Sequence, residues 1–216
     1  NMIDFLYNYA NNVYSANGED GINKKIIDHL NIKDGVVLEI GAWDGFFDSN
    51  CANLWSDGSH NGILIEATNR LDIEKLERKY DNINCFIEMI TSDNTLENII
   101  DKCKFEVNND NFVLASIDVD GDDLNVARSL GKYKPIILII EPNGDVIKKQ
   151  NPNGSSIKEL LDFGSDFGYD FIGMSGLVGR QSGNVYLVRN DYKSKFDICS
   201  KPWQQRGIIL SEGVLY

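Results

Sequence analysis

The sequence lacks any apolar run long enough to cross a membrane, and basic residues are scarce. No stretch approaches the roughly 18 consecutive apolar residues expected of a membrane span, and no signal-peptide pattern is recognisable. The 21 Lys and Arg residues stand against 33 Asp and Glu residues, which gives a formal net charge of −12. Nucleic-acid binding needs clustered cations that neutralise phosphates, so this balance argues against a nucleic-acid partner and suits a neutral or cationic ligand.

Cysteine and histidine are also scarce, and they do not show the spacing of metal ligands. The four cysteines form no CxxC pair and no ligand pattern with His29 or His60; they are Cys51, Cys85, Cys103 and Cys199. We therefore expect no zinc site. Reduced, mostly buried thiols are typical of an intracellular protein, so the sequence favours a cytoplasmic location.

Proline is rare, and no Ser/Gly-rich linker interrupts the 216 residues. This length and uniformity predict a single domain with a sizeable core. We expect N-terminal helices over residues 1–34, an α/β core over 35–190 and a C-terminal tail over 191–216. Asn1 precedes Met2, so the first residue is not an initiator, which is compatible with excision from a longer multidomain protein.

Two helical stretches are expected first, around Met2–Ser15 and Asp20–Leu30, and a regular alternation of strands and helices follows. The expected strands are Val36–Ile40, Gly62–Glu66, Asn84–Ile87, Phe112–Asp118, Pro135–Glu141, Tyr169–Gly173 and Asn184–Arg189. The helical stretches between them are Asp48–Ser56, Leu71–Tyr80, Leu96–Cys103, Leu124–Leu130 and Ser156–Phe167. Continuous apolar strands alternating with helices predict a mostly parallel sheet with helices on both faces. A Gly-rich turn joins the last two strands, so the seventh strand is expected to be antiparallel.

The segment VVLEIGAWDGFFDSN combines the first strand with a glycine-containing loop. Ligands of open α/β sheets bind beyond the carboxyl ends of the strands, and this strand ends at Glu39-Ile40-Gly41. Gly41-x-x-x-Gly45 lacks the third glycine of a dinucleotide fingerprint, and Glu39 and Asp44 would repel a diphosphate. These acids suit a ligand with an ammonium and a sulfonium centre. The next strand ends at Glu66, whose carboxylate can accept hydrogen bonds from two ribose hydroxyls.

The segment ASIDVDGDDLNVARSL crowds four carboxylates into six residues, and the fifth strand brings two more oxygen-bearing side chains beside them. These residues are Asp118, Asp120, Asp122, Asp123, Glu141 and Asn143. Crowded carboxylates repel one another unless a cation or protons offset their charge. The spacing fits neither an EF-hand loop nor an aspartyl-phosphatase motif, and oxygen-only ligands favour Mg²⁺ or Mn²⁺. As an alternative, Asp122 or Asp123 caps the following helix.

The motifs NGEDG, LEIGAWDG, ILIEA, SIDVDGDD and IIEPNG, in this order, resemble a branch of the FkbM-like class I S-adenosylmethionine-dependent methyltransferases. The acidic loop is also similar to that of metal-dependent sugar O-methyltransferases. The likeness spans Asn17 to about Arg189 and implies a Rossmann-like fold. Related domains occur in gene clusters that build surface glycans, including those of large viruses, which implies action in a host cytoplasm for a viral protein.

The resemblance implies specific roles for the motif residues. S-adenosylmethionine would contact Glu19, Glu39, Gly41, Asp44, Gly45, Glu66, Ala67, Ile90, Thr91 and Asp118. The cation ligands would be Asp118, Asp120, Glu141 and Asn143, and the catalytic residues would be Asp122, as the base, and Asp120. For Glu19 and its neighbour Asp20, capping of the following helix is an alternative role.

The function implied is O-methylation of a sugar hydroxyl in a glycan or a rhamnose-like deoxysugar. Expected partners are the sugar or glycan acceptor, other glycan-building domains and a second copy of the chain. Trp43, Trp203 and Tyr216 are candidates for stacking on a sugar face. One alternative is an NAD(P)-dependent oxidoreductase or epimerase, which would need the missing glycine and usually a Tyr-x-x-x-Lys pair. A second alternative is a non-catalytic binding module, against which the crowded acids argue.

Overall fold

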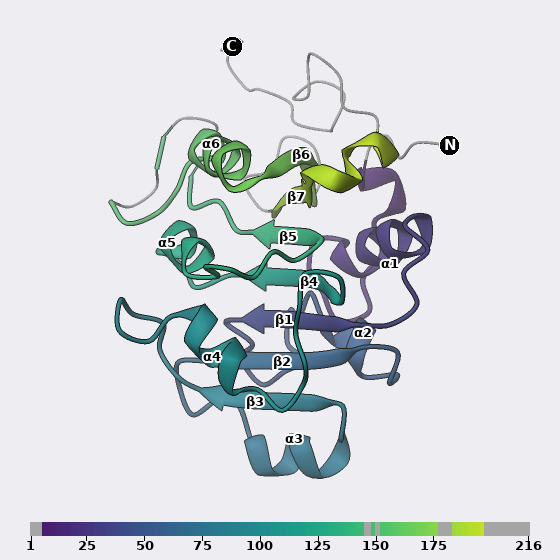
Figure 1. Ribbon diagram of the computed structural model, residues 1–216, viewed down its shortest axis with the longest axis vertical. Helices are drawn as coiled ribbons and strands as arrows, with labels where there is room; N and C mark the ends of the chain where they lie inside the picture. Colours follow the sequence, from purple (N-terminus) through teal and green to yellow (C-terminus); the bar gives the residue numbers. More distant parts are fainter. Residues whose placement is uncertain (1–5, 145–147, 150–151, 177–182, 197–216) are drawn as a thin grey trace.

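The computed structural model describes residues 6–144, 148–149, 152–176 and 183–196 (Figure 1). A seven-stranded sheet with the strand order β3-β2-β1-β4-β5-β7-β6 forms its centre. The strands are β1 Val36–Ile40, β2 Asn61–Glu66, β3 Ile83–Ile87, β4 Phe112–Ile117, β5 Ile137–Ile140, β6 Tyr169–Met174 and β7 Val185–Arg189. The first five strands pair in parallel, and β7 is antiparallel to both β5 and β6. The predicted fold class, including the antiparallel last strand, is confirmed.

Helices follow most of the strands. They are η1 Leu6–Tyr9, α1 Glu19–His29, α2 Ala52–Trp55, α3 Ile73–Lys79, α4 Leu96–Lys102, α5 Asp123–Arg128, α6 Ile157–Phe167 and η2 Asn190–Lys195. Two begin with a capping box, in which Thr95 and Ser156 exchange hydrogen bonds with the third residue of α4 and α6. Such caps satisfy amide groups that have no partner inside the helix. The chain therefore marks these helix starts locally.

The helices cover both faces of the sheet, as a doubly wound arrangement requires. On one face the core contains Ile22 and Ile26 of α1 and Trp55 of α2. On the other face it contains Ile99 of α4 and Leu160 of α6. Alternate strand residues point to opposite faces, so both layers are apolar and the strands are buried nearly throughout.

The expected helix over Met2–Ser15 is wrong for the residues described there, where only the short 3₁₀ helix η1 forms. The amides of Val13, Tyr14 and Ser15 donate to Asp20 Oδ2 at 2.7, 2.7 and 2.8 Å. A side-chain acceptor competes with the backbone carbonyls of a helix for these amides. Asp20 thus folds the chain before α1 into a turn. It does not cap α1, whose N-cap is Gly18.

The loops after β1 and β4 meet at the carboxyl edge of the sheet. β1 lies between β2 and β4, which is where the chain order reverses and where ligands of such sheets bind. Gly41 has φ 79°, and a Cβ atom there would lie 1.8 Å from the Asp118 carbonyl oxygen. Only glycine accommodates both the positive φ and this close contact. The contact of Gly41 with a ligand stays a prediction, and the contact that the structure shows is with the backbone of Asp118.

Candidate active site

A cavity of about 580 Å³ opens at this edge, a volume typical of small-molecule sites. The loops after β1, β2, β3 and β4 form its walls. Its lining residues are Ile40, Gly41, Trp43, Phe47, Asp48, Ile65, Glu66, Ala67, Thr68, Arg70, Glu88, Met89, Ile90, Asp118, Val119, Asp120, Asp122 and Val126. Six of these side chains are carboxylates and one, Arg70, is basic. Such a surface attracts a cationic ligand and repels a diphosphate.

Glu66 ends β2 and lies in the cavity wall, as predicted. Its Oε2 accepts the Trp43 amide at 3.0 Å, and its Oε1 accepts the amide and hydroxyl of Thr68 at 3.0 and 2.8 Å. These bonds fix the carboxylate and the loop after β1 relative to each other. Each carboxylate oxygen has two lone-pair sites, so Oε2 retains one site for a ligand hydroxyl.

Glu39 is buried beneath the loop and does not line the cavity. Its neighbours in β1 alternate between the two faces of the sheet, and Glu39 shares the face of Val37, against α1 and α2. The hydroxyl of Ser49 donates to Glu39 Oε2, and the Asn50 amide donates to Oε1 at 2.6 Å. Burial raises the pKa of Glu39 to about 7, although both hydrogen bonds oppose the shift. Glu39 thus supports the loop that carries Gly41 and Trp43.

Three further residues of the predicted cofactor set stabilise turns. Gly45 has φ 91°, and its amide donates to the Ala42 carbonyl at 2.7 Å. Asp44 Oδ1 accepts the amides of the two phenylalanines at positions 46 and 47 at 2.9 and 2.7 Å. The hydroxyl of Thr91 accepts the Asn94 amide at 3.1 Å. None of the three is in the cavity wall, whereas Ala67 and Ile90 are.

Glu19 lies away from the cavity wall, at the start of α1. Its Oε1 accepts hydrogen bonds from Ser175 Oγ at 2.6 Å and Asn184 Nδ2 at 2.9 Å, and its Oε2 accepts the Asn17 amide at 2.8 Å. These contacts tie α1 to the chain around β6 and β7. The structure therefore assigns Glu19 a buried structural contact rather than a place in the cavity.

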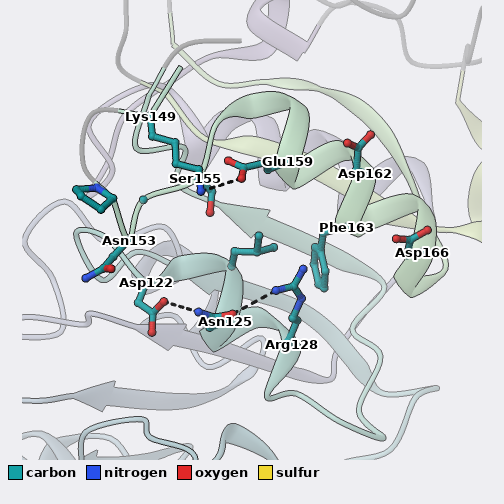
Figure 2. Close-up of a pocket in the computed structure, with 13 residues that line it drawn as sticks. Asp122, Asn125, Arg128, Lys149, Asn153, Ser155, Glu159, Asp162, Phe163 and Asp166 are labelled. Atoms are coloured by element: carbon teal, nitrogen blue, oxygen red, sulfur yellow. Dashed lines mark hydrogen bonds and ion pairs between the residues drawn. The ribbon is translucent and has the colours of Figure 1, made fainter. Parts of the chain in front are cut away.

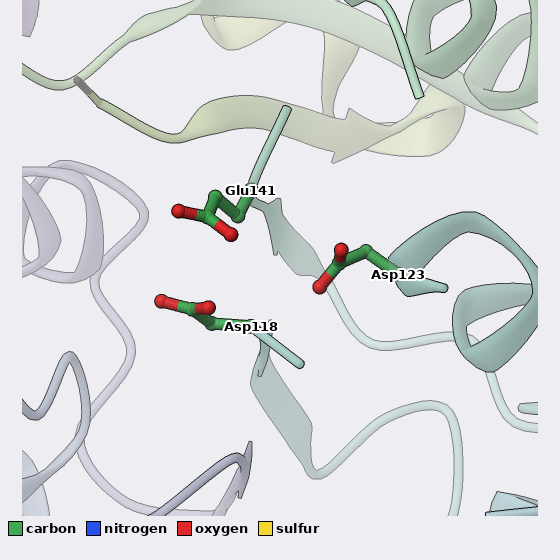
Figure 3. A group of neighbouring side chains, drawn as sticks. All are labelled: Asp118, Asp123 and Glu141. Carbon is green, nitrogen blue, oxygen red and sulfur yellow. The ribbon is translucent and has the colours of Figure 1, made fainter. Parts of the chain in front are cut away.

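Asp118, Asp123 and Glu141 bring their carboxylates together beside the cavity (Figure 3). They follow β4, begin α5 and follow β5, and one oxygen of each lies within 4.8 Å of the others. Asp123 is fully buried, and its two oxygens accept the amides of Val119 and Gly121 at 2.7 and 3.1 Å. These bonds hold the loop after β4 in a fixed shape and leave further lone pairs of Asp123 for another ligand.

The pKa values of this cluster are raised. Burial, followed by the charge of Asp118, raises the pKa of Glu141 to about 8. Burial is also the main cause that raises the pKa of Asp123 to about 6 and that of Asp118 above its usual range. Asp118 and Glu141 lie within hydrogen-bonding reach of each other. Without a cation they share a proton, because like charges this close oppose full ionisation.

The other predicted metal and catalytic residues lie around this cluster. Asn143 donates from Nδ2 to Glu141 Oε2 at 3.0 Å, and its Oδ1 is buried without a hydrogen-bond partner. Asp120, with φ 57°, and Asp122 are exposed in the cavity wall. The Asp122 side chain accepts from Asn125 Nδ2 at 2.7 Å and makes no hydrogen bond to a backbone amide of α5. Neither Asp122 nor Asp123 is therefore a side-chain cap of that helix.

The sequence reasoning missed two parts of this edge. Asp123 was interpreted only as a helix cap, because the boundary of α5 decides which acids of the run turn inward. Arg70 was not identified; its guanidinium carbon lies 3.7 Å from the centre of a Trp43 ring. Its place four residues after Glu66 was the available signal. The exposed Phe47 and Met89 complete an apolar rim with Trp43.

No protein-family model matches the sequence, and no curated protein matches it. Among solved structures, the fold is similar to that of the CurJ carbon methyltransferase, with a TM-score of 0.52 and 12% identity over 86% of this chain. This chain spans 57% of the length of that protein. At this identity the likeness concerns the fold alone. The chain has the fold of the class I S-adenosylmethionine-dependent methyltransferases.

Two further solved structures are weaker matches. An S-adenosylmethionine-dependent methyltransferase from Aquifex aeolicus has a TM-score of 0.46 and 15% identity, over 77% of this chain and 89% of the other. A second, from Geobacter sulfurreducens in complex with S-adenosyl-L-homocysteine, has a TM-score of 0.42 and 14% identity, over 78% and 71%. The sugar-specific branch expected from the sequence stays a prediction. Within the described residues, no helix combines the length and apolarity needed to cross a membrane.

Proposed function

We propose that this protein transfers a methyl group from S-adenosylmethionine to a hydroxyl oxygen of a sugar or glycan, assisted by a divalent cation such as Mg²⁺ or Mn²⁺. The observation that carries the proposal is the acid-rich cavity at the switch point of a class I methyltransferase fold, with the carboxylate cluster beside it. The cavity suits a cationic donor, and the cluster suits a hard cation.

The cofactor proposal rests on the walls of the cavity. Glu66 is positioned to accept a ribose hydroxyl at Oε2, and Ala67, Met89 and Ile90 offer an apolar surface for the adenine. Gly41 would lie beside the methionine part, with Asp118 and Asp120 near its positive charges. A sulfonium and an ammonium gain Coulomb energy from carboxylates at a partly buried site. The same carboxylates would repel a diphosphate.

The cation proposal rests on two independent features. Three carboxylates from three different elements converge within 4.8 Å, an all-oxygen set that suits Mg²⁺ or Mn²⁺. The buried Oδ1 of Asn143 lacks a partner, and a buried polar atom without a partner costs about 1–3 kcal/mol. Rotation of the amide would offer this oxygen to an ion held by Glu141. We therefore assign Asp118, Asp123 and Glu141 as ligands, with Asn143 beside them.

Methyl transfer to a hydroxyl needs a proton acceptor, because a sugar hydroxyl is scarcely ionised at neutral pH. A bound cation would lower the pKa of such a hydroxyl. Asp122 is exposed in the cavity wall and is the carboxylate we assign as the general base, a role that typically contributes ~10²–10⁴-fold. Asp120, in the neighbouring wall, would orient the acceptor.

Cofactor binding is tested first by thermal denaturation with S-adenosylmethionine, S-adenosylhomocysteine or NAD. A ligand that binds only the native state raises the melting temperature. We expect stabilisation by both adenosyl compounds and none by NAD. Stabilisation by NAD alone would indicate an oxidoreductase and refute the proposal.

Activity is then tested by transfer of a labelled methyl group to a panel of deoxysugars and glycan fragments. Transfer should stop with EDTA and return with Mg²⁺ or Mn²⁺; full activity after exhaustive chelation would remove the cation from the mechanism. Asp122→Asn should abolish turnover and leave the stabilisation by S-adenosylhomocysteine unchanged. Equal loss of both would refute the assignment of Asp122 as the base.

A further inference from the structure

A second cavity lies between α5 and α6, outside the proposed cofactor site (Figure 2). Its volume is about 370 Å³. The lining residues come from α5, from α6 and from the segment that precedes α6; they are Asp122, Leu124, Asn125, Arg128, Lys149, Pro152, Asn153, Gly154, Ser155, Glu159, Asp162, Phe163 and Asp166. We call it the α5–α6 cleft.

Three of the six charged groups of the cleft are in ion pairs, and two more, Asp122 and Arg128, bond to the neutral side chain of Asn125. Lys149 forms an ion pair with Glu159 at 2.8 Å, and Asp162 pairs with Lys158 of the same helix. Arg128 donates to Asn125 Oδ1 at 3.2 Å and lies over the Phe163 ring, 6.0 Å from its centre. Paired charges at an open surface attract a free ion only weakly.

The cleft nevertheless offers both donors and acceptors of hydrogen bonds. The amides of Asn125 and Asn153 and the guanidinium of Arg128 donate, while Asp122 and Asp166 accept. Leu124, Pro152 and the ring of Phe163 add apolar surface. Four carboxylates against two cations in the wall disfavour an anion. A neutral group with several hydroxyls matches this mixture, because each hydroxyl both donates and accepts.

The α5–α6 cleft and the larger cavity share one residue, Asp122. The next residue, Asp123, belongs to the carboxylate cluster. Asp122, the proposed base, therefore lies in the wall of both cavities, and the two cavities adjoin at this residue.

We propose that the α5–α6 cleft binds the second unit of an extended, polyhydroxylated acceptor, so that the substrate is an oligosaccharide rather than a single sugar. This rests on the proposed function for the methylated unit. The unit in the cleft would be held by Arg128, Asn125 and Asp166 and would fix which hydroxyl of its neighbour reaches the methyl group. Correct placement of the reacting group is itself a large part of the rate enhancement of such a transfer.

Binding in the cleft is tested without turnover, by NMR on the isotope-labelled protein. The reporters are the Gly154 backbone amide and the side-chain amides of Asn125 and Asn153; the Gly58 amide, in the turn before β2, is the control. The probes are rhamnose, glucose, a rhamnose disaccharide, cellobiose, lactose and 1,4-diaminobutane. We expect a disaccharide, and no monosaccharide, to shift the reporters. Shifts with the diamine alone, or with none of the probes, would overturn the proposal.

Methyl transfer gives the second readout, with the best disaccharide and its parent monosaccharide as acceptors. Arg128→Leu keeps an apolar side chain beside Phe163 but removes the donor. A hydrogen bond to a charged group typically contributes about 1.5–3 kcal/mol, so KM for the disaccharide should rise about tenfold or more. The KM for the monosaccharide should not change. Arg78→Leu, on the exposed surface of α3, is the matched control.

The two readouts separate this inference from the proposed function. If a disaccharide shifts the reporters but adenosyl compounds do not stabilise the protein, the cleft stands and the methyltransferase proposal fails. If methyl transfer proceeds and Arg128→Leu changes KM equally for both acceptors, or for neither, the cleft assignment fails and the methyltransferase proposal stands.

Discussion

Carboxylates at the ends of neighbouring strands, at the same edge of the sheet, have different surroundings. Glu39, at the end of β1, is held by the Ser49 hydroxyl and the Asn50 amide. Asp118 and Glu141, after β4 and β5, have each other as nearest partners. Burial raises the pKa at both places. Both oxygens of Glu39 accept a hydrogen bond, whereas Glu141 has one donor, Asn143 Nδ2, and the Asp118 carboxyl group beside it. A carboxylate surrounded by donors supports a loop, whereas crowded carboxylates are suited to hold a cation.

The largest expected effect is on activity and comes from the crowded carboxylates after β4 and β5. Glu141→Gln should lower the rate of methyl transfer by about 10²–10⁴-fold, the range typical of a lost catalytic group. Its free energy of unfolding should not fall, because burial and the neighbouring Asp118 raise the pKa of Glu141 to about 8, so that the neutral amide replaces a group that is already mostly protonated near neutral pH. Rates of labelled transfer and urea denaturation test both parts. Glu74→Gln, on the exposed side of α3, is the control, and a destabilised Glu141→Gln protein would contradict the comparison.

The contact that joins the two loops can be broken at Gly41. Gly41→Ala would bring Cβ to 1.8 Å from the Asp118 carbonyl oxygen, so we expect a loss of more than about 4 kcal/mol in stability. Gly58 is the matched control: its φ of 83° is close to the 79° of Gly41, but nothing lies within 4 Å of the position that a Cβ atom would take there. Gly58→Ala should cost only about 1–2 kcal/mol, the strain of a left-handed backbone. Equal losses in urea denaturation would show that the contact has no role.

The surroundings of Glu39 are tested by the pH dependence of stability. The pKa of Glu39 rises from 4.5 to about 7 on folding, so its contribution is fully present below pH 4.5 and is lost as pH rises through 7. Glu39→Gln keeps the shape and cannot ionise. Relative to the unsubstituted protein, it should therefore gain about 2 kcal/mol in unfolding free energy between pH 5 and pH 8. A pH-independent difference in urea denaturation would show that Glu39 is not buried as described.

The smallest effect concerns the apolar rim. Trp43 is 42% exposed and lines the cavity, whereas Trp55 is fully buried. S-adenosylhomocysteine should therefore change the fluorescence of Trp43 and not that of Trp55. Trp43→Phe should remove most of the change and weaken binding by no more than about tenfold, because a phenylalanine ring keeps part of the contact. An unchanged signal in Trp43→Phe would place the ligand away from this rim.

The sequence predicted the fold because strand and helix periodicity is a local property that this chain expresses clearly. Every expected strand forms, and α6 begins where Ser156 caps it. The region before α1 failed because Asp20 draws the preceding amides to its side chain, a contact that periodicity does not encode. A helical pattern in the sequence therefore does not form a helix where a side chain such as that of Asp20 binds the backbone amides.

The site was predicted less completely, because strand and loop directions decide which acids face the cavity. Glu66 and Gly41 lie in its wall, but Glu39 is buried beneath the loop after β1, where it bonds to Ser49. Glu19 bonds to Ser175. The acidic run predicted where the cluster lies. Whether Asp123 belongs to the cluster depends on where α5 begins, which the sequence did not show. A sequence shows that carboxylates gather; the turn geometry selects which of them converge.

The backbone contact at Gly41 also has a consequence for engineering. The loop after β1 touches the carbonyl of Asp118 with no space for a Cβ atom at position 41, so a new loop after β1 must keep this glycine and a new loop after β4 must keep the backbone path at position 118. Attempts to change the acceptor by exchanging one loop alone would disturb the donor side as well. The two loops are best transplanted together, as one cassette.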